Sequence, residues 1–166
     1  MWLSSARVPS HIAERVPIIP PDLVTEEFLN DYDRDTLWYD IFWHNGRVIA
    51  VAPLLVNFQE IIRTATIELD GRRVTPRIKN KRRYSQIEFR CPTPPQEISL
   101  SYEGWRHRGP VNRAERDRYK GRNGWVALNK DNHPDWVRDH ARFHRVHHGL
   151  NAVVLFDNNS EQFTIA

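Results

Sequence analysis

The chain has 166 residues, 40% hydrophobic and 27% charged, which is the composition of a globular protein and excludes a disordered one. This length accommodates one ordinary domain, or one small domain and part of another. The net charge of +3 comes mainly from arginine, which gathers in residues 72–83 and 106–122. Such clusters bind nucleic acid, anionic membranes or phosphorylated ligands, although a solvated surface explains them as well.

The sequence shows no targeting segment. Residues 1–7 lack the apolar core of a signal peptide, and the longest apolar run, residues 48–56, contains Pro53 and is too short to span a membrane. The single cysteine, Cys91, cannot form an internal disulfide, which fits a reducing compartment. We therefore expect a cytoplasmic protein without a transmembrane segment.

Residues 1–35 have no sustained hydrophobic period, and Pro17, Pro20 and Pro21 keep part of them extended. We expect this region to be a lead-in rather than a domain. One short helix is predicted within it, at residues 21–30.

Residues 36–103 predict a small antiparallel β-sandwich or barrel. Asn45-Gly46 joins two strand-forming runs at 37–43 and 47–52, and Asp70-Gly71 forms the turn of a second hairpin within residues 64–75. Further strands are expected at 84–89 and 97–102, a spacing typical of such all-β units. The predicted core consists of Trp38, Ile41, Trp43, Ile49, Val51, Ile67, Leu69, Ile87, Phe89, Ile98 and Leu100.

Residues 104–123 are polar and rich in arginine, and we expect them to form a basic connector. Trp105, Tyr119 and Trp125 are interleaved with these arginines, a mixture that can bind single-stranded nucleic acid. No complete nucleic-acid-binding motif accompanies them, so no nucleic-acid partner is assigned.

Residues 124–166 predict a strand, a helix and a strand, which form the first unit of an incomplete Rossmann-like domain. Residues 125–128 and 152–156 are apolar enough for buried strands covered on both faces. Pro134 suits the first helical position and Gly149 the left-handed position after the helix. The predicted fold class is therefore α+β, a sandwich followed by a right-handed parallel β-α-β unit. Its uncovered apolar strands predict self-association.

Two polar loops follow the carboxyl ends of these strands and meet at one edge of the sheet, where nucleotides tend to bind. They are Asn129-Lys130-Asp131-Asn132 and Asp157-Asn158-Asn159-Ser160. A carboxylate there can accept hydrogen bonds from ribose hydroxyls or a base N–H, while a lysine or a helix N-terminus can face phosphate. The alternative is that these residues only cap the helix and form turns.

Residues 124–160 resemble the opening of GT-A-type glycosyltransferases of the family 92 group and related bacterial surface-polysaccharide enzymes. The resemblance lies in Lys130-Asp131-Asn132 after the first strand, Trp136 and Phe143-His144 in the helix, His148-Gly149-Leu150, and a strand ending Phe156-Asp157-Asn158-Asn159-Ser160. The sequence departs from the pattern at His133, where many relatives carry an acid.

The resemblance implies a transferase that uses a nucleotide-sugar donor, with a uridine nucleotide favoured. Asp157 would contact the nucleoside, and Lys130 and Asn132 would line the donor cleft. The remaining candidates for the donor site are Asp131, Asn158 and Ser160.

The resemblance also implies a metal-binding Asp-x-Asp after a later strand, a Mn²⁺ or Mg²⁺ ion that offsets pyrophosphate charge, and a catalytic base. No such element follows Ser160, and Asp31-Tyr32-Asp33 and Asp33-Arg34-Asp35 precede the sandwich, in the wrong topological place. We therefore expect no catalytic residue and no cofactor in this chain. It would be the amino-terminal portion of a transferase, inactive by itself.

Two alternatives remain. The histidines at positions 140, 144, 147 and 148 have spacings that place pairs on one helix face, as in some zinc sites, but no metalloprotease glutamate or third ligand accompanies them. The chain could instead be a non-enzymatic carbohydrate- or nucleic-acid-binding module. Trp38 and Trp43 would stack on a sugar if exposed, although their strand favours core positions.

Overall fold

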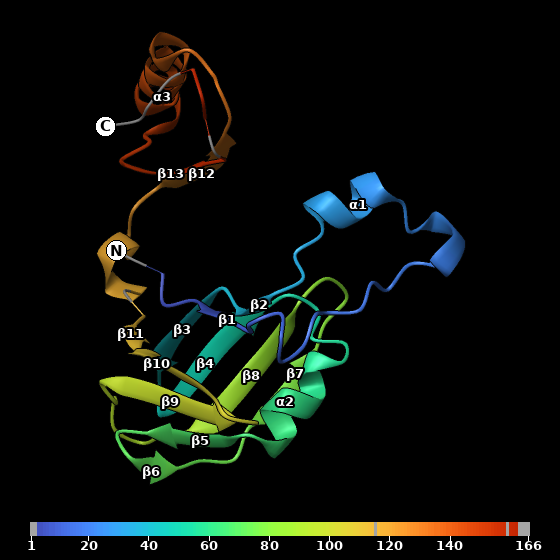
Figure 1. Cartoon of the computed structure of the whole chain (residues 1–166). Helices are drawn as coiled ribbons and strands as arrows, with labels where there is room; N and C mark the ends of the chain where they lie inside the picture. The colour runs from blue at the N-terminus through green and yellow to red at the C-terminus, as the bar shows by residue number, and fades with distance from the viewer. Residues whose placement is uncertain (1–2, 115, 159, 163–166) are drawn as a thin grey trace. The chain divides into compact units, whose positions relative to one another are not determined.

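The computed structural model describes residues 3–114, 116–158 and 160–162. The chain divides into two compact units, Met1–Ala114 and Glu115–Ala166, called here the first and the second unit. Both contain strands and few helices, so the protein belongs to the α+β class (Figure 1). Among the described residues, every helix is too short or too polar to cross a membrane.

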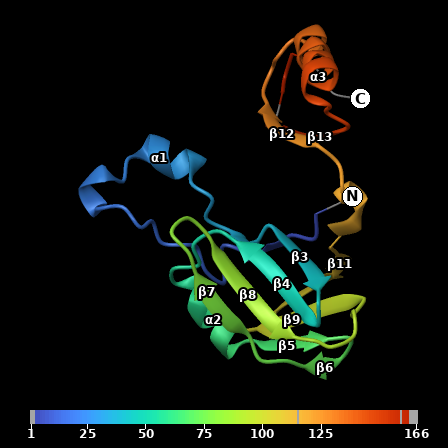
Figure 2. The same cartoon turned by 180° about the vertical axis from the view of Figure 1, so that it is seen from behind.

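Two sheets make up the body of the first unit. Their strand orders are β10-β9-β5-β6 and β11-β3-β4-β8-β7, and every pair is antiparallel except β11 with β3, which is parallel (Figures 1 and 2). Neither order closes on itself, so the described strands form no barrel. The bounds are β3 Asp40–His44, β4 Arg47–Ala52, β5 Thr66–Leu69, β6 Arg72–Arg73, β7 Arg77–Asn80, β8 Ser85–Arg90, β9 Glu97–Tyr102, β10 Trp105–Pro110 and β11 Asn112–Arg113.

The predicted hairpins are confirmed. Asn45 (φ 45°) and Gly46 (φ 76°) connect β3 to β4, and Asp70 (φ 47°) and Gly71 (φ 74°) connect β5 to β6. Positive φ at both central residues is what a type I′ turn needs, and Asn-Gly and Asp-Gly supply it at little cost. The strand expected at 97–102 is β9, and the one expected at 84–89 is β8, shifted by one residue.

The expected connector at 104–123 instead begins with two strands. Residues 105–110 form β10, which pairs with β9 from Trp105 opposite Tyr102 to Pro110 opposite Glu97, and β11 follows it. The arginines of β10 alternate with half-buried side chains. Such alternation is typical of a strand with one face exposed to solvent, but the polar composition of the segment did not indicate a strand.

The core is one cluster enclosed by both sheets and by α2 (Phe58–Thr64). Its fully buried members include Trp38, Ile41, Ile67, Ile87, Phe89, Ile98 and Leu100, as predicted. Ile49 and Val51 are only half-buried, whereas Val48, Ala50 and Ala52 are buried, so the expected inner face of β4 was wrong.

Strand register explains this difference. Ile41 pairs with Ala50 and Trp43 with Val48, and residues opposite each other in a ladder point to the same face. Ile49 pairs with Phe42 on the other face. A shift of one residue moves every side chain across the sheet, so the partner strand decides which alternate set is buried.

Residues 1–35, expected to be a lead-in, contribute to the first unit. β1 (Ala6–Arg7) pairs with β2 (Thr36–Trp38), and Ala6 and Val8 are buried. Both ends of the unit meet at Asp40, whose Oδ1 accepts hydrogen bonds from Ser4 N (2.9 Å) and Asn112 Nδ2 (2.8 Å). The helix predicted at 21–30 is found as a 3-10 turn, η1 (Pro21–Leu23), and α1 (Glu26–Asp31).

The second unit has the predicted order of strand, helix and strand. η2 (Arg116–Tyr119) precedes β12 (Gly124–Asn129), α3 (Pro134–His148) and β13 (Ala152–Asp157), and the two strands pair in parallel from Gly124 opposite Ala152 to Asn129 opposite Asp157. The predicted helix ends are confirmed, because Pro134 is the first helical residue and Gly149 has φ 63°.

Many apolar side chains of the second unit are exposed. α3 contains no buried residue, and the strand residues Val126, Leu128 and Phe156 are largely exposed. Coverage on both faces, which the apolar runs suggested, is not found among the described residues, whereas the uncovered apolar faces expected of an incomplete sheet are. Trp125 contacts His140 of α3, with ring centroids 4.6 Å apart, and Trp125 and Leu155 line a cavity beneath the helix. Val126, Leu128 and Phe156 form an open sheet face.

Candidate functional site

The parallel register of β12 and β13 places Asn129 beside Asp157, as the paired-loop hypothesis expected. Asn129 is buried, and its Nδ2 donates to Asp157 Oδ1 over 3.1 Å. Its carbonyl oxygen accepts a hydrogen bond from Asn158 N at 2.7 Å. The carboxyl ends of the two strands are thus fastened to each other.

Ser160 bridges the two loops. Its backbone N–H donates to Asp157 Oδ2 over 3.0 Å, and its hydroxyl bonds to Asp157 Oδ1. The same hydroxyl oxygen accepts the backbone N–H of Asp131 at 2.9 Å. Three of the predicted site residues, Asp131, Asp157 and Ser160, therefore lie in one network.

The loop after β12 is held by its own polar groups. Asp131 has φ 50°, and its Oδ1 accepts the N–H groups of Glu161 and Gln162 at 2.8 Å each. Asn132 donates through Nδ2 to Asn129 Oδ1 over 3.0 Å. These bonds are of the kind that the turn-forming alternative predicted, since Asp and Asn side chains here satisfy nearby backbone groups.

Hydrogen bonding also sets the charge of the site. The Ser160 hydroxyl, then the Ser160 backbone N–H, then the Asn129 amide lower the pKa of Asp157 below its usual range. Donors that favour the charged form keep a carboxylate ionised. Asp157 is therefore an anionic acceptor at neutral pH.

The remaining predicted residues face outward. Lys130 and Asn158 are exposed, and Asn159 lies outside the described residues. Lys130 directly follows the end of β12, so a positive charge lies next to the Asp157 network in sequence. The structure thus joins Asp131, Asn132, Asp157 and Ser160 and leaves Lys130 and Asn158 at the surface.

A cavity of about 230 Å³ lies between α3 and the strands, beside Asn129 and Asn132. Its walls include Trp125, Trp136 and Leu155, so it is apolar with an amide-lined end. The helical spacing of Trp136 and His140 marked an apolar stripe, but did not show that an open cavity would lie between the stripe and the strands.

The four histidines pack on aromatic rings. Ring centroids are 4.5 Å apart for His140 and His144, 5.1 Å for His144 and His148, and 4.6 Å for His140 and Trp125. Burial, with smaller effects of His140 and His148, lowers the pKa of His144. In the described part of the chain, no group of three or more His, Cys, Asp or Glu side chains is arranged to hold a metal.

The tryptophans considered for sugar stacking lie in the first unit, and both donate hydrogen bonds to backbone carbonyl groups. Trp38 is fully buried and donates through Nε1 to Ser4 O at 3.1 Å. Trp43 packs against the edge of the core and donates to Cys91 O at 2.8 Å. Trp38 therefore presents no free face for a sugar ring, and Trp43 is only partly exposed.

The two basic clusters have different surroundings. Residues 72–83 include β6 and β7, each of which is one of the two edge strands of its sheet, where charged side chains discourage pairing with another chain. Residues 106–122 are divided between the two units, because Arg106 and Arg108 lie on β10 while residues from 115 onward belong to the second unit.

The sequence matches no family model, no curated protein and no solved structure. The resemblance to GT-A-type glycosyltransferases therefore rests on the residues quoted for it.

Proposed function

We propose that residues 124–160 recognise the nucleotide-sugar donor of a GT-A-type glycosyltransferase, of which this chain is the amino-terminal portion. The observation that carries the proposal is the hydrogen-bond network of Asp131, Asp157 and Ser160. It joins two polar loops at the carboxyl ends of parallel strands, which is where open α/β sheets bind nucleotides.

Each part of the network has a use in donor recognition. The ionised Asp157 can accept a hydrogen bond from a ribose hydroxyl or from the N–H of a uracil base. The apolar cavity walled by Trp125 and Trp136 suits a planar ring, and the amides of Asn129 and Asn132 lie at its end. Lys130 is exposed and can face the diphosphate.

Titration of the chain with UDP, UMP and a UDP-sugar, followed by amide NMR, tests this proposal. We expect shifts near Asn132 and Asp157, and we expect Asp157→Asn to abolish them while largely preserving the shape of the side chain. The matched control is Asp139→Asn, which changes an exposed acid on α3 outside the network. The proposal is contradicted if no uridine nucleotide shifts the amide signals of the unaltered chain. It is also contradicted if Asp157→Asn and Asp139→Asn show equal shifts.

Two further expectations belong with this proposal. The open sheet face of Val126, Leu128 and Phe156 would associate with a second copy of the chain, because apolar side chains gathered on one face favour contact over hydration. The single, half-buried Cys91 fits a reducing compartment, and the cytoplasm is the location we propose.

A further inference from the structure

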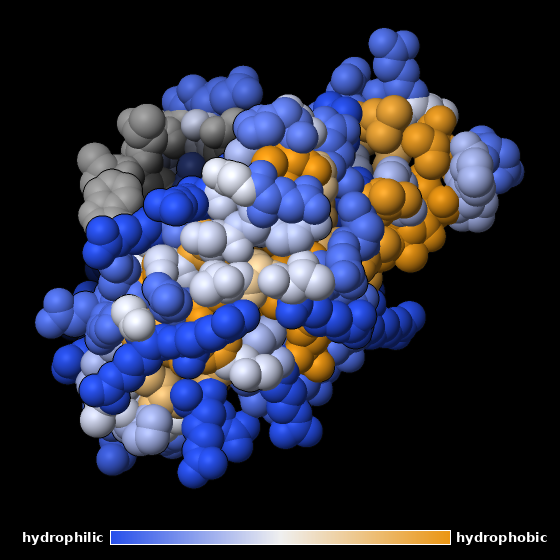
Figure 3. All heavy atoms as spheres, turned by 60° about the horizontal axis from the view of Figure 1, so that its bottom comes forward, coloured by the Kyte–Doolittle hydropathy of each residue, from blue (hydrophilic) through white to orange (hydrophobic). Residues whose placement is uncertain are grey.

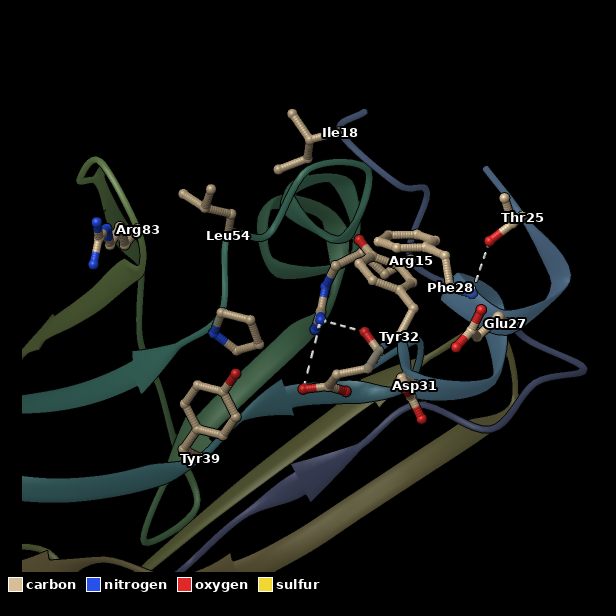
Figure 4. Close-up of a pocket in the computed structure, with 12 residues that line it drawn as sticks. Arg15, Ile18, Thr25, Glu27, Phe28, Asp31, Tyr32, Tyr39, Leu54 and Arg83 are labelled. Atoms are coloured by element: carbon tan, nitrogen blue, oxygen red, sulfur yellow. Dashed lines mark hydrogen bonds and ion pairs between the residues drawn. The ribbon is translucent and has the colours of Figure 1, made fainter. Parts of the chain in front are cut away.

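A pocket of the first unit lies under an arm, defined here as residues 16–33, which carries η1 and α1. This arm pocket has a volume of about 620 Å³, within the roughly 300–1,000 Å³ typical of small-molecule sites. Figure 4 shows residues of the arm on one side of it, Leu54 and Tyr39 of the body facing them, and Arg83 on a separate loop. In Figure 3, apolar atoms gather on the side where the arm lies, against a largely hydrophilic surface.

The floor of the arm pocket is fixed by Arg15. Its side chain is buried, Nη1 donates to Asp33 O at 2.6 Å and lies 3.7 Å from the Asp33 carboxylate, and Nη2 donates to Thr36 O. The guanidinium also lies over the Phe58 ring, 5.0 Å from its centroid. Arg15 therefore fastens the arm to the core, and its Nη groups are already committed to protein acceptors.

Aromatic rings line the space above this floor. Phe28 and Tyr32 stack with centroids 5.2 Å apart, and the Tyr32 hydroxyl donates to Val16 O at 3.1 Å. Tyr39 is 45% exposed, and burial, followed by the charge of Asp33, raises the pKa of its phenol, so Tyr39 is neutral. These rings are held in place before any ligand arrives, and the Tyr39 ring has an open face.

The charges around the rim select the kind of ligand. Glu27 and Asp31 are exposed carboxylates on the arm, and Arg83 lies on a loop outside it. The two acids disfavour a phosphate or carboxylate ligand, because Arg15 is already neutralised by Asp33. Arg83 disfavours a cation. Carboxylate acceptors, a guanidinium donor and aromatic rings together suit a neutral ligand rich in hydroxyl groups.

From this arrangement we propose that the arm pocket binds a neutral carbohydrate, with one sugar ring against Tyr39. The C–H face of this ring would pack on the phenol ring, while hydroxyl groups of the saccharide donate to Glu27 and Asp31 and accept from Arg83. This proposal does not rest on the donor site in the second unit. It gives the first unit a glycan-binding role at a place that neither Trp38 nor Trp43 lines.

The test is titration of the whole chain with neutral trisaccharides, namely maltotriose, cellotriose and N-acetylated chitotriose, followed by saturation-transfer NMR and calorimetry. We expect at least one of them to bind, and Tyr39→Ala to weaken binding about fivefold, since an aromatic contact contributes about 1 kcal/mol. The matched control is Tyr119→Ala, because Tyr119 is 44% exposed and lies in the second unit. This control should bind as the unaltered chain does.

Two further variants keep the test decisive if Tyr39→Ala folds poorly. Tyr39→Phe keeps the ring and should retain most of the affinity, whereas Asp31→Asn weakens an acceptor and should lower it. The proposal is overturned if no neutral trisaccharide binds at millimolar concentration, or if trigalacturonate binds better than every neutral sugar. Equal losses in Tyr39→Ala and Tyr119→Ala would also overturn it.

Discussion

Glu88 joins three strands of the five-stranded sheet through one buried carboxylate. Its side chain is 7% exposed, and it accepts hydrogen bonds from Arg47 Nη1 at 2.9 Å and from Lys79 Nζ. β8, which carries Glu88, lies between β4 with Arg47 and β7 with Lys79. Replacement by glutamine keeps the size of the side chain but leaves two cations facing an uncharged amide.

The expected loss of stability follows from exposure. A hydrogen bond to a charged group contributes about 1.5–3 kcal/mol. Arg47 is 54% exposed and Lys79 33%, so water screens both contacts and their contributions do not simply add. We expect Glu88→Gln to lower the free energy of unfolding by about 2–3 kcal/mol, or the melting temperature by roughly 8–12 °C for a unit of this size.

The assay is urea and thermal unfolding of the whole chain, followed by tryptophan fluorescence, to which Trp38, Trp43 and Trp105 of the first unit contribute. The matched control is Glu97→Gln, which breaks an exposed pair with Arg108 at 2.6 Å and should cost less than about 1 kcal/mol. Equal losses in the two variants would refute the argument from burial. So would a more stable Glu88→Gln chain.

The effect of Glu88→Gln should also depend on pH. The hydrogen bond from Lys79, with help from Arg47, lowers the pKa of Glu88 against the opposing effect of burial. A carboxyl whose pKa is lower in the folded state stabilises that state above its unfolded pKa of about 4.3. The stability difference between the two chains should therefore be complete at neutral pH and shrink as the pH falls below about 4.

Three other variants test the core, a helix end and the open sheet face. Phe89→Ala should cost about 3–5 kcal/mol, because this ring is fully buried, and a shift of the urea midpoint by much less would contradict the core assignment. Gly149→Ala should cost about 1 kcal/mol and lower the melting temperature of α3 by circular dichroism, because φ is 63° there and an added Cβ meets nothing within 4 Å; an unchanged helix melt would disprove a backbone cost. Leu128→Lys should reduce self-association in sedimentation velocity, and an unaltered chain that stays monomeric at every concentration would remove the basis for this expectation.

The elements that could be predicted from the sequence are those with local signals. Asn45-Gly46 and Asp70-Gly71 specify their turns without help from the rest of the chain, and Pro134 and Gly149 do the same for the ends of α3. α2 was missed although Phe58 and the pair Ile61 and Ile62 have helical spacing, because the segment is only two turns long.

The inner face of β4 could not be predicted in this way. Residues 48–52 are all apolar, so the run has no alternation that would separate the inner face from the outer one. The register of β4 with β3 and β8 decides which of its side chains are buried, and register depends on contacts between strands rather than on one strand alone.

The two candidate sites also differ in whether the sequence could predict them. The meeting of Asn129 with Asp157 could be predicted, since a parallel β-α-β unit brings the ends of its strands to one edge. The arm pocket could not, because Arg15, Tyr39 and Arg83 come from segments far apart in sequence. Asp31 and Asp33 drew attention as a misplaced metal motif, and the structure places them at a pocket instead.

Because Ser4 and Asn112 both donate hydrogen bonds to Asp40, the two ends of the first unit lie close together. Ser4 Oγ also donates to Pro110 O at 2.5 Å, so entry and exit lie side by side. A unit built in this way can be inserted into a host protein as a cassette, since it needs no long linkers to span its own width. A circular permutant of this unit could join residue 113 to residue 3 and have its new ends at Gly71, where a Cβ would meet no atom within 4 Å. We expect it to keep all of its strands.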